Sequence, residues 1–351
     1  MLNRSLVVLI LFAALTPGQE LSGQVFRTGT DVVVAPTVVT TKAGDYINGL
    51  RQQDFQLTDN GKPQDIKVDV TYVPISLVVA IQANSTAEPV LPKIQKIGSL
   101  FKGLLTGDQG EVALVAFDHR IQVLQDFTSD TDKVEQALQK LRPGSSSSCM
   151  TDAVVAAARM LKNRPKERRR VLLLISETRD KGSSGKVREA MTDLQFDNIS
   201  VYSVNINRLV TTMLAKPMPP RPSAIPATAH PLPAGVPPTP ENAAQVYGNA
   251  GNSANFIPVF VEIFKQVKGI FVDNPVEVYT KYTGGRETSF VTQRDLERAI
   301  SSIGDELHSE YLITYVPNNR QEGGFHDISV TVNRRDAKLR TRPGYWVASQ
   351  Y

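Results

Sequence analysis

The sequence has little of several features that mark common protein classes. Cys149 is the only cysteine among 351 residues, so no disulfide can form within the chain. Lysine and arginine number 39 against 35 aspartate and glutamate, a balance too even for the basic surface that holds a phosphate backbone. Neither the Gly-x-Gly-x-x-Gly pattern nor the Walker phosphate loop occurs. These absences exclude a disulfide scaffold and disfavour binding of nucleic acid or nucleotides.

A continuous apolar run lies close to the amino terminus, where Leu6 to Leu15 follow Arg4 and precede Thr, Pro and Gly. This run is well short of the roughly 20 residues that a membrane-spanning helix needs. A basic residue, an apolar run and small residues in this order are typical of a secretory signal peptide. We therefore predict a signal peptide at residues 1–23 and a bacterial protein that is secreted, periplasmic or in the cell envelope, with no transmembrane anchor.

Two kinds of hydrophobic pattern divide the rest of the chain. Residues 24–73 carry short strand-like segments and the turn signal Asp59-Asn60-Gly61, which predicts a small antiparallel β module. Over residues 74–316, apolar runs alternate with stripes at helical spacing, which is typical of a mainly parallel sheet covered by helices on both faces. The last run, at 311–316, is expected to complete that sheet. Residues 317–351 predict a C-terminal β-hairpin that is able to join the N-terminal strands in one small sandwich.

The apolar runs and stripes are specific enough to place elements. Strands are predicted at 77–81, 112–117, 121–124, 171–175 and 199–206, and helices at 94–104, 134–141, 153–161, 187–194 and 296–307.

Two segments fit connections rather than regular elements. Ten of the 22 prolines lie between Pro217 and Pro240, where missing backbone donors block regular structure. Helical spacing resumes afterwards at Phe260, Phe264 and Val267, so we predict a Pro-rich insertion within the α/β domain. The basic run from 162 to 170 lies between a predicted helix and a predicted strand, which is typical of a solvated connection.

Several segments occur in a specific order along the chain. They are Leu77–Thr86, Gly110–Phe117, Thr151–Val154, Arg170–Ser176 and Tyr282–Arg286, with Arg342-Pro343-Gly344-Tyr345 near the end. In this order and spacing, over residues 26–347, the chain resembles the von Willebrand factor type A family, and more closely its bacterial, acidobacterial-type group. The resemblance implies an α/β fold with a Rossmann-like, doubly wound sheet, flanked here by N- and C-terminal β strands. It also implies a role in adhesion or protein–protein interaction.

Most members of that family hold Mg²⁺ at a metal-ion-dependent adhesion site, using an Asp-x-Ser-x-Ser loop, a Thr and a second Asp. The resemblance puts Gln82, Asn84 and Thr86 in the first loop, Ser148 at the Thr position and Glu177 at the second Asp. Mg²⁺ prefers octahedral oxygen ligands that include one or two carboxylates, and this set has a single carboxylate. We predict a degenerate adhesion site and no cofactor, with weak Mg²⁺ binding as the alternative.

No sequence signature pairs a nucleophile with a base. Cys149 precedes a predicted helix, whose N-terminus is able to lower the thiol pKa, but no motif joins it to any of the four histidines. We therefore expect a non-enzymatic interaction module that binds a protein partner. Two alternatives stay open: an envelope hydrolase that uses Cys149 or Glu177, and a periplasmic carrier of a small ligand, which needs a deep apolar pocket.

Overall fold

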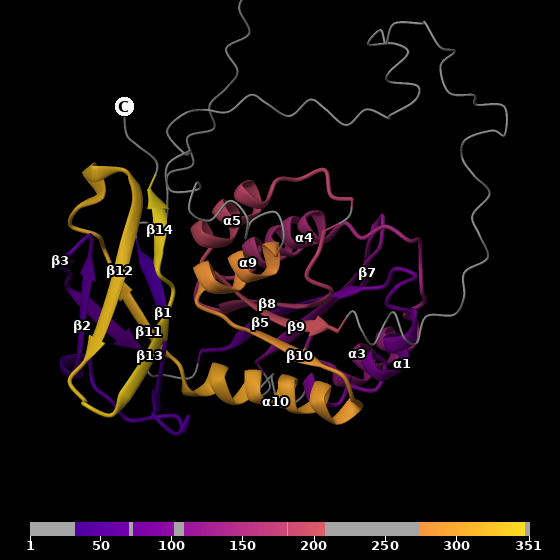
Figure 1. The fold of residues 1–351 in the computed structure, drawn as a ribbon, viewed down its shortest axis with the longest axis horizontal. Helices are drawn as coiled ribbons and strands as arrows, with labels where there is room; N and C mark the ends of the chain where they lie inside the picture. Colours follow the sequence, from indigo (N-terminus) through magenta and orange to yellow (C-terminus); the bar gives the residue numbers. More distant parts are fainter. Residues whose placement is uncertain (1–31, 70–72, 102–108, 181, 208–273, 348–351) are drawn as a thin grey trace, which may run out of the picture.

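The computed structural model describes residues 32–69, 73–101, 109–180, 182–207 and 274–347. The predicted signal peptide, the Pro-rich insertion and the stripe at Phe260, Phe264 and Val267 lie outside these residues. Figure 1 shows an α/β module, with a sheet between two layers of helices, beside a β sandwich built from strands near both ends of the described chain.

A six-stranded sheet forms the centre of the α/β module, as predicted. Its central strands consist mainly of buried Val, Leu, Ile and Ala, the composition of strands that are covered on both faces. The strand β7, at one edge, runs antiparallel to its neighbour, and the other neighbouring pairs are parallel. In their order across the sheet the strands are β10 (Glu287–Phe290), β9 (Ile199–Ile206), β8 (Arg169–Ser176), β5 (Ile75–Gln82), β6 (Glu111–Phe117) and β7 (Ile121–Thr128).

Helices cover both faces of this sheet because alternate strand residues point to opposite sides. Leu77 and Val79 belong to one core, Val78 and Ala80 to the other. The first face is covered by α1 (Leu91–Ile94), α3 (Thr131–Gln139) and α10 (Gln293–Ser309), and the second by α4 (Met150–Lys162), α5 (Val187–Phe196) and α9 (Pro275–Thr283). None of the helices in the described ranges is long and apolar enough to cross a membrane. Short 3-10 turns lie at η1 (Gln52–Asp54), η2 (Glu88–Val90) and η4 (Arg320–Glu322).

The helix predicted over 94–104 is wrong in its extent. The helix α1 ends at Ile94, and residues 95–99 are not helical, although Ile97 and Phe101 are fully buried as the stripe predicted. Gly98 packs directly on α3, where an added Cβ would lie 2.3 Å from Cγ of Glu135. Glycine is a poor helix former, and this close approach gives it a packing role instead.

Two four-stranded antiparallel sheets form the sandwich, and their facing side chains make a third core that includes Phe55 and Tyr311, with ring centroids 5.0 Å apart. Asn60 and Gly61 have φ of 49° and 74°, so the predicted turn joins β2 to β3 as a hairpin. One sheet has the order β13 (Ala337–Thr341), β1 (Val33–Thr41), β11 (Tyr311–Tyr315), β4 (Ile66–Asp69). The other has the order β14 (Gly344–Val347), β12 (Gly324–Val332), β2 (Phe55–Asp59), β3 (Lys62–Pro63).

Two predictions about strand partners are wrong. The segment 311–316 does not complete the parallel sheet, because β11 pairs with β1 and β4 in the sandwich, and β10 takes the edge position instead. In β11 buried and half-buried residues alternate, a pattern that fits a strand with one covered face. The expected C-terminal hairpin is also absent from the described strands: β2 and β14 occupy both edges of β12, so β13 joins the opposite sheet beside β1.

Candidate functional site

The candidate site lies at the edge of the six-stranded sheet where the parallel strands end. β5 ends at Gln82, β6 at Phe117 and β8 at Ser176, so the loops that follow them meet at one edge. In open α/β sheets this edge is where ligands bind. The five residues that the resemblance singled out lie in or beside these loops.

Asn84 is the centre of the first loop. Its Oδ1 accepts hydrogen bonds from Gln82 Nε2 at 2.9 Å, from Thr86 Oγ1 at 2.9 Å and from the Ala87 amide at 3.2 Å. The amide of Glu177 donates to Gln82 Oε1 at 2.8 Å, which ties the loop after β8 to the first loop. Gln82 and Asn84 are fully buried. The structure therefore brings four of the five residues into one hydrogen-bonded network, Glu177 through its backbone.

Ser148 belongs to a second loop, which is joined to the first by its backbone. The Ser85 amide donates to the Ser145 carbonyl at 2.8 Å, and the Gly144 amide to the Ala83 carbonyl at 2.6 Å. The Ser148 hydroxyl is buried and has no hydrogen-bond partner in the described part of the chain. Ser148 thus lies on the loop beside Asn84 without entering its network.

The oxygen atoms of this network fit Mg²⁺ poorly. The amide oxygens of Gln82 and Asn84 already accept hydrogen bonds, and Gln82 Nε2 is a donor where an aspartate would supply an oxygen. Glu177 is the single carboxylate of the five residues, and its side chain is one methylene longer than the aspartate usual in the family. Since Mg²⁺ demands near-ideal octahedral oxygen geometry, these residues as they stand do not make a suitable ligand set.

Asp118 organises this edge, and the sequence reasoning missed it. Its carboxylate accepts hydrogen bonds from the amides of Ser145 and Arg120, both at 2.8 Å, and lies 3.0 Å from His119 Nδ1. Burial raises the pKa of Asp118, but these hydrogen bonds outweigh it and hold the pKa below its usual value. An added Cβ at Gly144 would lie 2.2 Å from Asp118 Oδ2, so this glycine permits the contact. The available signal was an Asp directly after the apolar run of β6.

Two further carboxylates fix the loop after β8 to the first turn of α4. Asp180 accepts from the amides of Thr151 at 2.8 Å and Ser183 at 3.1 Å. Asp152 accepts from the amides of Ser184 at 2.9 Å and Gly185 at 2.8 Å. Burial raises the pKa of Asp180. Hydrogen bonds from Ser183, Thr151 and Gly182 lower this pKa by more than burial raises it, so the net shift is downward. Both side chains therefore serve as acceptors for loop amides.

Cys149 is the N-cap residue of α4, and its thiol pKa is raised, which contradicts the alternative in which the helix N-terminus lowers it. Its Sγ donates to the Gly182 carbonyl at 3.1 Å. Burial raises the pKa of the thiol, and the nearby carboxylates of Asp152, Asp180 and Asp118 raise it further. The thiol is therefore protonated at neutral pH, whereas the nucleophile of a cysteine enzyme is a thiolate.

Because the network is buried, other side chains face the solvent at this edge. We call His119, Arg120, Ser146 and Arg179 the rim; all four are exposed. The rim is polar and carries two arginines that are charged at any physiological pH. A partner that approaches this edge meets the rim before it meets Gln82 or Asn84.

A family comparison agrees with the fold. Residues 88–179 match the family model described as von Willebrand factor type A domain. A search of curated proteins finds no match. Among solved structures, similarity is found to the vWF domain of the type V pili tip protein Mfa5 from Porphyromonas gingivalis, at 22% identity over 31% of this chain and 40% of that chain, with a TM-score of 0.27.

Two further solved structures are similar over larger shares of their own length. BatB from Bacteroides thetaiotaomicron has 15% identity over 66% of this chain and 99% of that chain, with a TM-score of 0.39. The SpRpn10 VWA domain has 15% identity over 41% of this chain and 83% of that chain, with a TM-score of 0.32. The assignment to an acidobacterial-type group stays a prediction. The family match at residues 88–179 runs from η2 through β8 and includes β6 and β7, and this chain therefore contains a von Willebrand factor type A domain.

Proposed function

We propose that the protein is a secreted or envelope, non-enzymatic module that binds another protein through the loops at the carboxyl edge of its six-stranded sheet, without Mg²⁺. The observation that carries the proposal is the network around Asn84 Oδ1, in which neutral amides take the place of the carboxylates that a metal would need. A degenerate adhesion site of this kind leaves recognition to the protein surface around it.

The rim supports the same proposal and gives the partner a chemical character. Arg120 and Arg179 project from two of the three loops, and the loops themselves are fixed by Asp118, Asp152 and Asp180. A fixed surface binds with little loss of conformational entropy. Its positive charge favours an acidic patch on the partner and speeds encounter with it.

The chemistry of the two candidate nucleophiles argues for binding over catalysis. Cys149 has a raised thiol pKa and donates to a backbone carbonyl instead of contacting a histidine. Glu177 is buried, with 2% of its surface exposed, and its amide is bound to Gln82. Neither residue offers a substrate an activated and accessible group.

The test compares charge reversal at two positions of the rim with charge reversal at one position elsewhere on the surface. Arg120→Glu with Arg179→Glu alters the rim, and Arg298→Glu alters an exposed position on α10, which covers a face of the sheet. Partners captured from native envelope fractions are then quantified with and without a metal chelator. We expect the rim variant to lose the captured partner by about tenfold or more, and the α10 variant and the chelator to have no effect.

Two outcomes would overturn the proposal. Loss of the partner on chelation would indicate a metal-dependent site. Substrate turnover by the purified protein that disappears when the rim loops are altered would indicate an enzyme.

A further inference from the structure

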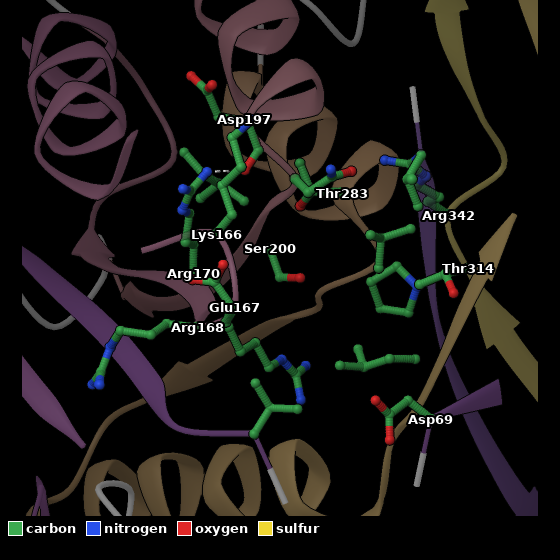
Figure 2. Close-up of a pocket in the computed structure, with 18 of the residues that line it drawn as sticks. Asp69, Lys166, Glu167, Arg168, Arg170, Asp197, Ser200, Thr283, Thr314 and Arg342 are labelled. Carbon is green, nitrogen blue, oxygen red and sulfur yellow. Dashed lines mark hydrogen bonds between the residues drawn. The ribbon is translucent and has the colours of Figure 1, made fainter. Parts of the chain in front are cut away.

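A cleft of about 1110 Å³ lies between the two modules, at the opposite edge of the six-stranded sheet from the rim. One wall is formed where β8 and β9 begin, at residues 168–170 and 199–200. The other wall comes from β1, β4 and β11 of the sandwich. Figure 2 shows Lys166, Arg168 and Arg170 on the first wall, and Thr314 and Arg342 facing them from the second.

The cleft is strongly basic. Seven lysines and arginines line it, against three aspartates and glutamates. Five of the seven belong to the run from 162 to 170, so the segment expected to be only a solvated connection also forms a wall of this cleft. Some of the charges are paired: Lys162 lies 3.8 Å from Asp197, and Arg169 forms a buried ion pair with Glu310.

Arg342 differs from these paired cations. It is 97% buried, since 3% of its surface is exposed, and its Nε has no hydrogen-bond partner among the described residues. Its guanidinium lies over the ring of Tyr345, 5.5 Å from the centroid. Burial lowers the pKa of Arg342 to about 10, so the side chain still carries its charge at neutral pH.

The nearby acid Asp59 does not neutralise Arg342 by a direct contact. The Asp59 carboxylate accepts hydrogen bonds from four other side chains, the hydroxyls of Tyr315 and Tyr345, a ring nitrogen of His326 and the amide of Asn319. The charge of Asp59 favours the charged form of Arg342, but a buried guanidinium nitrogen without a hydrogen bond is costly. A planar guanidinium pairs best with a carboxylate or another oxyanion. Arg342 therefore indicates an anion that comes from outside the described residues.

The sandwich wall also offers apolar surface. Val34 on β1 and Leu312 on β11 line the cleft and are only partly buried. Lys67 and Lys166, both exposed, lie at its walls and strengthen the attraction for negative charge. The cleft thus combines one buried cation, exposed cations and a hydrophobic wall.

We propose that this cleft binds an amphipathic carboxylate, an organic acid with an apolar chain. The carboxylate pairs with the guanidinium of Arg342, and the chain lies against Val34 and Leu312. This site goes beyond the proposed function, because it uses the opposite edge of the sheet and residues of both modules. Ligand binding here does not depend on whether the rim binds a protein.

The first experiment is a calorimetric titration of the protein with three probes up to about 10 mM. Octanoate has both a carboxylate and an apolar chain, 1-octanol has the chain without the charge, and inorganic phosphate has the charge without the chain. We expect saturable binding of octanoate. The affinities for 1-octanol and for phosphate should be weaker by a factor of about ten or more. Absence of octanoate binding would overturn the proposal. Equal binding of 1-octanol, or equal binding of phosphate, would also contradict it.

The second experiment locates the site with matched variants. Arg342→Gln removes the buried charge and should weaken octanoate binding by about tenfold or more. Lys67→Glu with Lys166→Glu changes only exposed side chains, so it keeps the test valid if Arg342→Gln does not fold, and it should weaken binding several-fold. Arg298→Gln, with a side chain 76% exposed on α10, is the control and should bind as the unmodified chain does. Octanoate affinity unchanged in the lysine variant would reject the cleft as the site.

Discussion

Two buried polar clusters, one at the carboxyl edge of the sheet and one inside the sandwich, differ in the kind of acceptor that they supply with hydrogen bonds. Around Asn84 the acceptor is a neutral amide, and its donors are a second amide, a hydroxyl and one backbone group. In the sandwich the acceptor is the fully buried carboxylate of Asp59. Its donors are Tyr315 at 2.9 Å, Tyr345 at 2.8 Å, His326 at 2.6 Å and Asn319 at 3.0 Å.

The difference shows when a buried charge is tolerated. Asp59 lies on β2 and reaches Tyr315 on β11 of the facing sheet, and three of its four donors lie on strands of the two sheets. Burial and the Asp59 carboxylate raise the pKa of Tyr345, which keeps that hydroxyl protonated as a donor. Fixed donors thus replace water around the carboxylate. Around Asn84 the hydrogen-bonded side chains are neutral, so no charge has to be compensated within that network.

The largest effect is expected from breaking the charged cluster. Asp59→Ala leaves four buried donors without their acceptor, and we expect a loss of about 3–5 kcal/mol in the free energy of unfolding, measured in urea. Asp65→Ala, at an exposed position of the same β module, should change it by less than about 0.5 kcal/mol. A loss below about 1 kcal/mol in the Asp59 variant would mean that the carboxylate is not central to the sandwich.

A smaller effect should follow from making the neutral cluster resemble the charged one. Gln82→Asp with Glu177→Asp supplies two short carboxylates beside Asn84, Thr86 and Ser148. With a Kd of about 1 mM, about 10 mM Mg²⁺ would add about 1.4 kcal/mol to the stability of this variant. The unmodified chain should show no such gain, and Glu177→Asp alone provides the matched control. Strong Mg²⁺ binding by the unmodified chain, abolished in Glu177→Ala, would reverse our interpretation of the site.

The smallest effect is expected in how the stability contribution of Asp180 depends on pH. The pKa of Asp180 is lowered in the folded protein, so its contribution to stability is present above the ordinary Asp pKa of about 3.9 and is lost as the pH falls through the folded value. Asp180→Asn should therefore destabilise the protein at pH 7, by about 1 kcal/mol or less for this half-buried group, and the difference should vanish in strong acid. Thermal unfolding of both proteins between about pH 7 and pH 3 measures this difference. A difference that grows on acidification would contradict the assignment.

Hydrophobic pattern predicted most of the α/β module, because strands that are covered on both faces must be apolar throughout. The runs in β5, β6, β8 and β9 and the stripe in α10 all proved to be elements of the predicted kind. The pattern failed where local composition does not decide the partner. β10 has the sequence Glu-Thr-Ser-Phe and carries no apolar run, yet it pairs with β9, while the more apolar β11 joins the sandwich.

The site was predictable in its members but not in its contacts. The resemblance identified Gln82, Asn84 and Glu177, but nothing in the sequence gives the direction in which an amide group donates. Arg342 was visible only as part of a shared ending of the chain. Among the described residues its Nε has no hydrogen-bond partner, because Asp59 is held by side chains far away in sequence, and spacing along the chain does not reveal that arrangement.

The pairing of β1 with β11 and β13 has a consequence for how the chain acquires its structure. Val33 pairs with Tyr315 and Thr37 with Thr341, so the first described strand finds its neighbours only after the whole α/β module has been synthesised. Contacts between such distant residues close slowly, and unpaired strand edges promote aggregation in the meantime. The α/β module is therefore expected to fold first. The edges of β1 stay unpaired until residues 311–347 have been synthesised.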